Sequence, residues 1–77
     1  MNKIYTSSEL FWHDLEIHKK HPDRNIVGQI RKIHDDGRFL VLRKIDTDLY
    51  KSMLITSDYK KAKDELSMVI FGRMGAI

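Results

Sequence analysis

Histidines and acids near the N-terminus are the residues of this chain whose types and spacing could support chemistry. Asp14 and His18 are four residues apart, His13 adjoins Asp14, and His21 follows His18 by three residues. On a helix, this spacing could assemble a zinc site or a general base oriented by a carboxylate. The two residues between His18 and His21 are lysines, whose positive charge opposes a bound cation. We therefore expect a solvated, basic helix end and no metal site.

Other catalytic patterns are missing from the sequence. It contains no glycine-rich phosphate loop, no His-Glu-x-x-His motif and no serine within a Gly-x-Ser-x-Gly turn. The absence of cysteine excludes disulfides and thiolate metal sites. Asp35 and Asp36 form a pair of carboxylates, but they precede Gly37, as acids in turns commonly do. We expect a protein that is not an enzyme and that uses no cofactor.

Basic residues are concentrated in the middle of the chain. Residues 25–45 contain five Lys or Arg and two Asp, whereas the segments before and after are balanced, so the formal charge of +3 arises here. Phosphate recognition requires several cations on one surface, with aromatic or amide side chains nearby to contact bases. The residues predicted to bind nucleic acid or a partner are Arg31, Lys32, Arg43, Lys44, Lys51 and Tyr50.

Two alternatives to nucleic-acid binding remain. The first is a purely structural role, because Lys and Arg also protect edge strands from aggregation. The acidic turn at Asp35 and Asp36 would moreover repel phosphates. The second alternative is a protein-only adaptor or inhibitor, which would dock through apolar and aromatic residues such as Phe11 and Trp12. Trp12 also suits the core-facing side of an N-terminal helix, and a core position is the interpretation that we favour for it.

The elements that would position these residues begin with a helix over residues 7–20. Thr6 and Glu9 have the spacing of a capping box, in which each side chain bonds the backbone of the other. Apolar residues follow at helical intervals, and Pro22 ends the segment because the residue before proline avoids the α region.

A β-hairpin is predicted next, from two β-rich runs that flank residues 34–37. A third strand follows over residues 49–56. With three-residue loops at 35–37 and 46–48, side-chain alternation divides the basic residues between the two faces of the sheet. One face would carry Gln29, Arg31, Arg43 and Lys51, and the other Lys32, Lys44 and Tyr50.

The C-terminal segment has two interpretations. A helix that begins after Ser57 either continues to Gly72 or ends near Leu66. In the second case residues 67–71 form a fourth strand, which their β-branched and aromatic content favours. We favour the helix followed by a strand.

A short part of the predicted hairpin resembles a known motif. Ile26–Ile30 followed by Phe39–Leu42 is similar to the first motif of Sm-like RNA-binding barrels. The acidic residue and the asparagine that this family has at the bend find no counterpart here. No functional residue is therefore assigned from the resemblance.

Together these elements predict a single small α+β domain over residues 1–77. An N-terminal helix would pack on a three- or four-stranded antiparallel meander, flat or curled as a small barrel, with a C-terminal helical segment. We expect a cytoplasmic, non-catalytic binding or regulatory module that acts on nucleic acid or a nucleic-acid-handling complex. Neither a membrane nor a small-molecule substrate is expected as a partner. Small size without disulfides favours either self-association as a homo-oligomer or docking on a partner.

Overall fold

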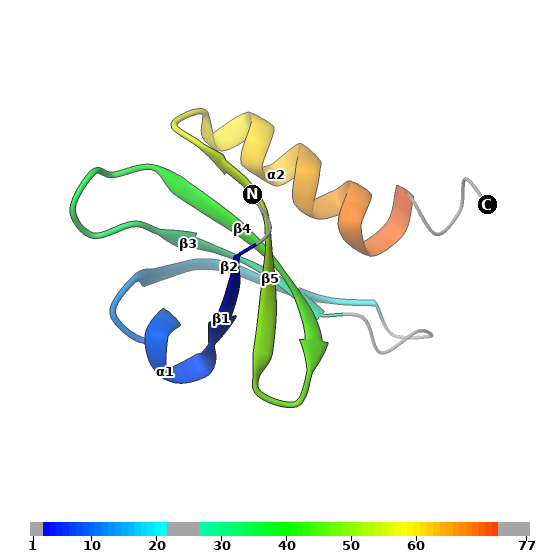
Figure 1. Ribbon diagram of the computed structural model, residues 1–77. Helices are drawn as coiled ribbons and strands as arrows, with labels where there is room; N and C mark the ends of the chain where they lie inside the picture. Colours follow the sequence, from blue (N-terminus) through cyan, green and yellow to red (C-terminus); the bar gives the residue numbers. More distant parts are fainter. Residues whose placement is uncertain (1–2, 22–26, 73–77) are drawn as a thin grey trace.

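One five-stranded antiparallel sheet forms most of the structure (Figure 1). The computed structural model describes residues 3–21 and 27–72, the last two by their backbone alone. The strand order is β1-β5-β4-β3-β2, so that β2 to β5 form a meander and β1 pairs with β5. The elements are β1 (Ile4–Thr6), α1 (Ser7–Leu10), β2 (Asp14–Lys20), β3 (Val27–Lys32), β4 (Phe39–Asp46), β5 (Leu49–Thr56), α2 (Tyr59–Ser67) and the π-helical turn η1 (Met68–Gly72).

The sheet separates two hydrophobic clusters. On one face α2 and η1 cover Ile30 and Val41, and on the other Leu10 of α1 packs against Leu40 and Leu42. All five of these side chains are fully or almost fully buried. Because successive strand residues point to opposite faces, the continuous apolar run in β4 supplies both clusters. The central strands are therefore covered on both sides.

The expected helix over residues 7–20 is wrong. The capping box is present, since the Glu9 N–H donates to Thr6 Oγ1 and the Thr6 N–H donates to Glu9 Oε1, but α1 ends after one turn. β2 then begins at Asp14 and pairs with β3. A helix here would gain only its internal hydrogen bonds, whereas the strand satisfies its backbone along β3 and places Ile17 beside the α2-side cluster.

The expected strand over residues 67–71 is also wrong. The chain continues from α2 into η1, and Val69 and Ile70 are buried in the cluster beneath α2. Their β-branched side chains favour a strand locally, but a continued helix buries both against the sheet. The expected fold of an N-terminal helix on a three- or four-stranded meander is therefore replaced by a five-stranded sheet with one C-terminal helix and the short α1.

The predicted hairpin is confirmed, with its register shifted by one residue. β3 and β4 pair antiparallel, but Arg31 lies opposite Leu40 and Lys32 opposite Phe39. The Ile33 N–H donates to the carbonyl of Arg38, so the turn holds residues 34–37, one more than expected. A shift of one residue moves every side chain of a strand to the other face relative to its neighbour.

Candidate binding surfaces

The predicted basic residues divide between the two faces of the sheet, but not as the sequence suggested. Direct pairing across β4 and β5 confirms that Arg43 and Lys51 share one face and that Lys44 and Tyr50 share the other. Because of the register shift, Arg31 and Lys32 exchange faces. The side that α2 covers carries Lys32, Arg43 and Lys51, and the opposite side carries Arg31, Lys44 and Tyr50.

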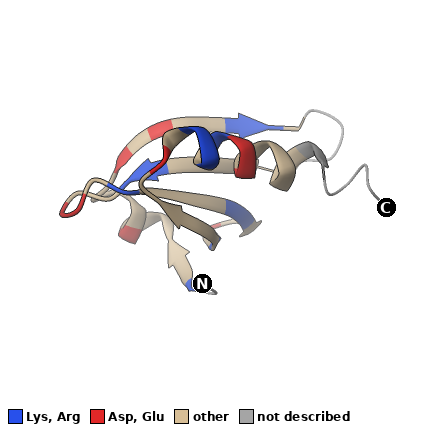
Figure 2. Cartoon of the chain, turned by 90° about the horizontal axis from the view of Figure 1, so that it is seen from above, with Lys and Arg blue, Asp and Glu red and all other residues tan. Residues whose placement is uncertain are grey.

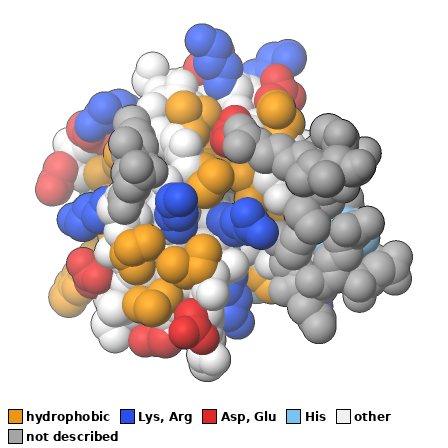
Figure 3. Space-filling model, turned by 45° about the vertical axis from the view of Figure 1, so that its right-hand side comes forward, with side chains coloured by type: hydrophobic (Ala, Val, Ile, Leu, Met, Phe, Trp, Pro, Cys, Tyr) orange, Lys and Arg blue, Asp and Glu red, His pale blue; other side chains and the backbone are white. Residues whose placement is uncertain are grey.

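Arg43 and Lys51 form the candidate basic site, which we call the basic pair. They are direct cross-strand neighbours, both half-buried, and neither side chain forms an ion pair or hydrogen bond within the described part of the chain. Ile4, opposite Lys51 on β1, is 42% exposed, and Ile45 is 48% exposed. On the face drawn in Figure 3, basic side chains lie next to a group of hydrophobic ones. Like charges directly opposite each other destabilise a sheet.

Arg31 has a structural role within the domain. Its Nε donates to Gln29 Oε1 at 2.6 Å and its Nη1 donates to the His13 carbonyl at 3.0 Å. Gln29 is only 4% exposed, so Arg31 satisfies a buried amide as well as a loop carbonyl. The Arg31 guanidinium therefore already donates hydrogen bonds within the domain, whereas, among the described residues, the side chains of the basic pair do not.

Lys44 and Tyr50 lie at the margin of the second cluster, which is formed by Leu10, Leu40 and Leu42. Tyr50 is half-buried, packs against that cluster and faces Tyr5 on β1. The Nζ of Lys3 lies 4.8 Å from the centre of the Tyr5 ring. Much of the Tyr50 ring thus contributes to packing, which leaves less of it for a ligand.

Phe11 and Trp12 form an exposed aromatic pair. Their side chains are 81% and 75% exposed, and the rings meet edge to face with centroids 6.4 Å apart. The expectation that Trp12 lies in the core is wrong, because α1 turns Leu10 inward instead and leaves it 1% exposed. Large aromatic side chains in this position are typical of interaction surfaces.

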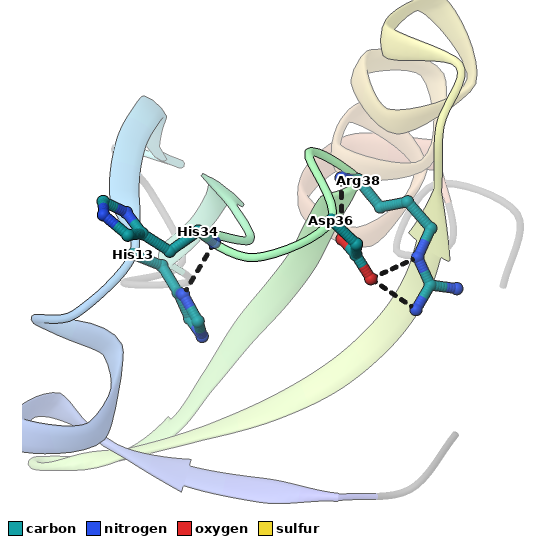
Figure 4. Close-up of polar contacts among 4 residues, drawn as sticks. All are labelled: His13, His34, Asp36 and Arg38. Carbon is teal, nitrogen blue, oxygen red and sulfur yellow. Dashed lines mark hydrogen bonds and ion pairs between the residues drawn. The ribbon is translucent and has the colours of Figure 1, made fainter.

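Hydrogen bonds fix the loop that carries the aromatic pair. The His13 N–H donates to the Leu10 carbonyl at 3.0 Å, and the His34 N–H donates to His13 Nδ1 at 3.3 Å (Figure 4). Together with the bond from Arg31 to His13, these contacts tie the loop to β3 and to the hairpin turn. The aromatic pair is therefore presented on an ordered backbone, which lowers the entropy cost of binding.

Asp36 and Arg38 neutralise each other at the tip of the hairpin (Figure 4). Asp36 accepts hydrogen bonds from the Arg38 backbone N–H at 2.9 Å and from Nε at 2.8 Å. These bonds to Arg38 lower the pKa of Asp36 from its usual 3.8. Half of the repulsive charge expected at this turn is therefore compensated locally.

The lowered pKa of Asp36 predicts a pH-dependent contribution to stability. Because the folded-state pKa lies below 3.8, the contribution is complete above that value and is lost as the pH falls through the folded pKa. In an NMR titration, the Asp36 carboxyl should titrate below 3.8, and Arg38→Gln should return its midpoint towards 3.8. Identical midpoints in the two proteins would contradict this assignment.

A shallow pocket opens at the start of α2. Its volume is about 330 Å³, and its lining includes Glu16, Lys32, Phe39 and Tyr59. The Phe39 and Tyr59 rings are 5.0 Å apart, so one wall is aromatic. Glu16 falls within the helix that the sequence predicts over residues 7–20, so its position near the other three residues was not expected.

The histidines and acids of the N-terminal segment do not assemble the chemistry considered for a helix. Asp14 and His18 lie on β2, where helical spacing no longer applies. Within residues 3–21 and 27–72, no three His, Asp or Glu side chains are grouped as a metal site requires. In that same part of the chain, no helix has the length and apolar character needed to cross a membrane.

A functional proposal for this chain depends on its geometry, because comparison with known proteins found no match. No protein-family model, curated protein or solved structure matches the chain.

Proposed function

We propose that this protein is a small non-catalytic module that binds nucleic acid, or a complex that handles nucleic acid, through Arg43 and Lys51. The observation that supports it is the juxtaposition of two cations on β4 and β5 with no carboxylate partner in the described structure. Their repulsion costs stability in the free protein, and a phosphate backbone would relieve it. The exposed Ile4, which lies opposite Lys51 on β1, extends the contact area beside them.

The proposed site uses fewer basic residues than the sequence predicted. Arg31 is occupied by Gln29 and His13, and Lys44 lies on the opposite face of the sheet. Lys32 is exposed on the α2 side, but at the other end of that face, beside Glu16 in the pocket. A ligand centred on the basic pair therefore needs neither Arg31 nor Lys44.

Charge reversal of the basic pair tests the proposal. In anisotropy titrations with single-stranded oligonucleotides, Arg43→Glu with Lys51→Glu should lower affinity by more than about tenfold and reduce the salt slope by about 0.7 for each phosphate that the protein no longer neutralises. The matched control, Lys3→Glu with Lys44→Glu, makes the same charge change on the opposite face. Circular dichroism would verify that both variants fold. Unchanged binding by the first variant, or an equal loss in the control, would reject the basic pair as the site.

A protein-binding role is the second candidate, and the exposed Phe11–Trp12 pair favours it. Truncating both rings with Phe11→Ala and Trp12→Ala should weaken partner binding by more than about 2 kcal/mol if they are the anchor of an interface. Pull-downs with wild-type protein and this variant, each with and without nuclease, would measure the effect. A partner that survives nuclease and high salt but is lost with the variant supports this role. One that is lost with nuclease supports the basic pair instead.

A further inference from the structure

β2 forms an open edge of the sheet. It pairs with β3 on one side, and within residues 3–21 and 27–72 no strand pairs with its other side. Every β2 residue is exposed except Ile17, which is half-buried. A strand in this position offers unpaired N–H and C=O groups to another chain. The opposite edge, β1, has only three residues and is a much shorter template.

Charge is segregated along this edge. Asp14 and Glu16 lie in the first half of β2, and His18, Lys19 and Lys20 lie in the second half, with Ile17 between them. Figure 2 shows the separation: the outer strand is red in its first half and blue at its end. Uniform charge would repel a second copy in every register, whereas this arrangement is complementary to itself when reversed.

We propose that two copies of this chain associate by antiparallel pairing of their β2 strands about a two-fold axis near Ile17. Antiparallel pairing places Ile17 against Ile17 of the second copy and the acidic half of each strand beside the basic half of the other. Such an interface is isologous, because the same surface is used twice and the assembly closes as a dimer. The two sheets become one continuous sheet.

The β-bulge in β2 is compatible with this pairing. The register with β3 shifts between Leu15 and Ile17, which can move the residue opposite Asp14 by one position. Asp14 then faces Lys19 or Lys20 of the second copy, and both are cations. Asp14 therefore meets a cation in either alignment.

The exposed aromatic pair is close in sequence to the same edge. Phe11 and Trp12 lie three and two residues before β2 begins at Asp14, so at each end of the junction they would be near the Lys20 end of the second copy's strand. Indole and phenyl faces attract an ammonium group. The dimer would thus use the largest exposed side chains as well as the open edge. Arg43 and Lys51 lie on β4 and β5, so this inference does not rest on the proposed nucleic-acid site.

A charge-swap experiment tests the dimer. One variant carries Asp14→Lys and Glu16→Lys, and the other carries Lys19→Glu and Lys20→Glu. Each alone should self-associate at least about tenfold more weakly than the wild type, because like charges meet across the junction. An equimolar mixture should restore association as a heterodimer. Lys61→Glu with Lys63→Glu, which reverses two exposed α2 lysines, should dimerise like the wild type.

Sedimentation and light scattering over a range of concentrations would measure these equilibria, with circular dichroism to verify folding. NMR spectra of the wild type at increasing concentration give an independent readout, in which amide shifts and slowed hydrogen exchange should concentrate in residues 11–20. A wild type that stays monomeric up to about 1 mM, or concentration-dependent shifts elsewhere, would overturn the proposal. So would folded variants whose mixture associates no better than either alone.

Discussion

Leu10→Ala will destabilise the protein by about 2–5 kcal/mol, while Trp12→Ala two residues later will change stability by less than about 0.5 kcal/mol. The difference follows from burial, since Leu10 is 1% exposed and Trp12 is 75% exposed. Leu10 fills the second cluster against Leu40 and Leu42, so its truncation removes apolar contacts and leaves a cavity. Trp12 contacts Phe11 and otherwise faces outward.

Urea unfolding followed by circular dichroism would measure both changes. In a domain of this length each kcal/mol corresponds to about 4–8 °C in Tm, so Leu10→Ala is expected to lower the Tm by roughly 10 °C or more. If that variant does not fold, Leu10→Val provides the same comparison with a smaller loss. A larger effect for Trp12→Ala than for the Leu10 variants would contradict the fold around α1. The same pair of variants separates stability from binding, because only Trp12 belongs to the proposed protein-binding surface.

Gly28→Val will destabilise the protein by about 1–3 kcal/mol through overpacking between the sheet and α2. A Cβ atom at Gly28 would lie 2.6 Å from Leu66 Cδ1, 3.1 Å from Ile70 Cδ1 and 3.1 Å from the Leu42 carbonyl oxygen. Leu66 and Ile70 are fully buried, so they cannot move aside without disturbing the cluster. The carbonyl belongs to the β4 backbone and is equally confined.

A double-mutant cycle tests the cause of this effect. Leu66→Ala removes the atom closest to the new side chain, so Gly28→Val with Leu66→Ala should cost less than the sum of the two single changes. Gly37→Ala is the matched control: φ at Gly37 is +72° and nothing lies within 4 Å, so its cost of about 1–2 kcal/mol is backbone strain alone. Its combination with Leu66→Ala should be additive. Additivity in the Gly28 cycle would show that contact with Leu66 is not the cause.

Parts of the candidate sites were predictable because they depend on short sequence separations. The adjacency of Arg43 and Lys51, and of Lys44 and Tyr50, follows from the loop at 46–48 and from alternation along the strands. The position of Arg31 was not predictable to the same degree, because one additional residue in the turn at 34–37 moved it to the other face. The face that a strand residue occupies can be predicted only if the number of residues in each turn is known.

The secondary structure of the N-terminal and C-terminal segments could not be predicted from nearby residues. The pattern of residues 14–20 is compatible with a helix or a strand, and these residues form a strand because they pair with β3. Residues 68–72 have strand-like composition, but a helical turn buries Val69 and Ile70 between α2 and the sheet. Both choices depend on partners distant in sequence, so local propensity could not settle them.

By itself, the sequence determined features that adjacent residues complete among themselves. These are the capping box of Thr6 and Glu9, the hairpin turn that contains Gly37 and the cross-strand basic pair joined by the short loop at 46–48. Only the tertiary structure decided that Leu10 is buried and Trp12 exposed, and that residues 14–20 form the edge strand of the described sheet, with their acids and bases in opposite halves. The physical reason is that caps and turns gain their energy within a few residues. Burial, and the pairing of strands that no short turn joins, arise between segments that meet only when the chain has folded.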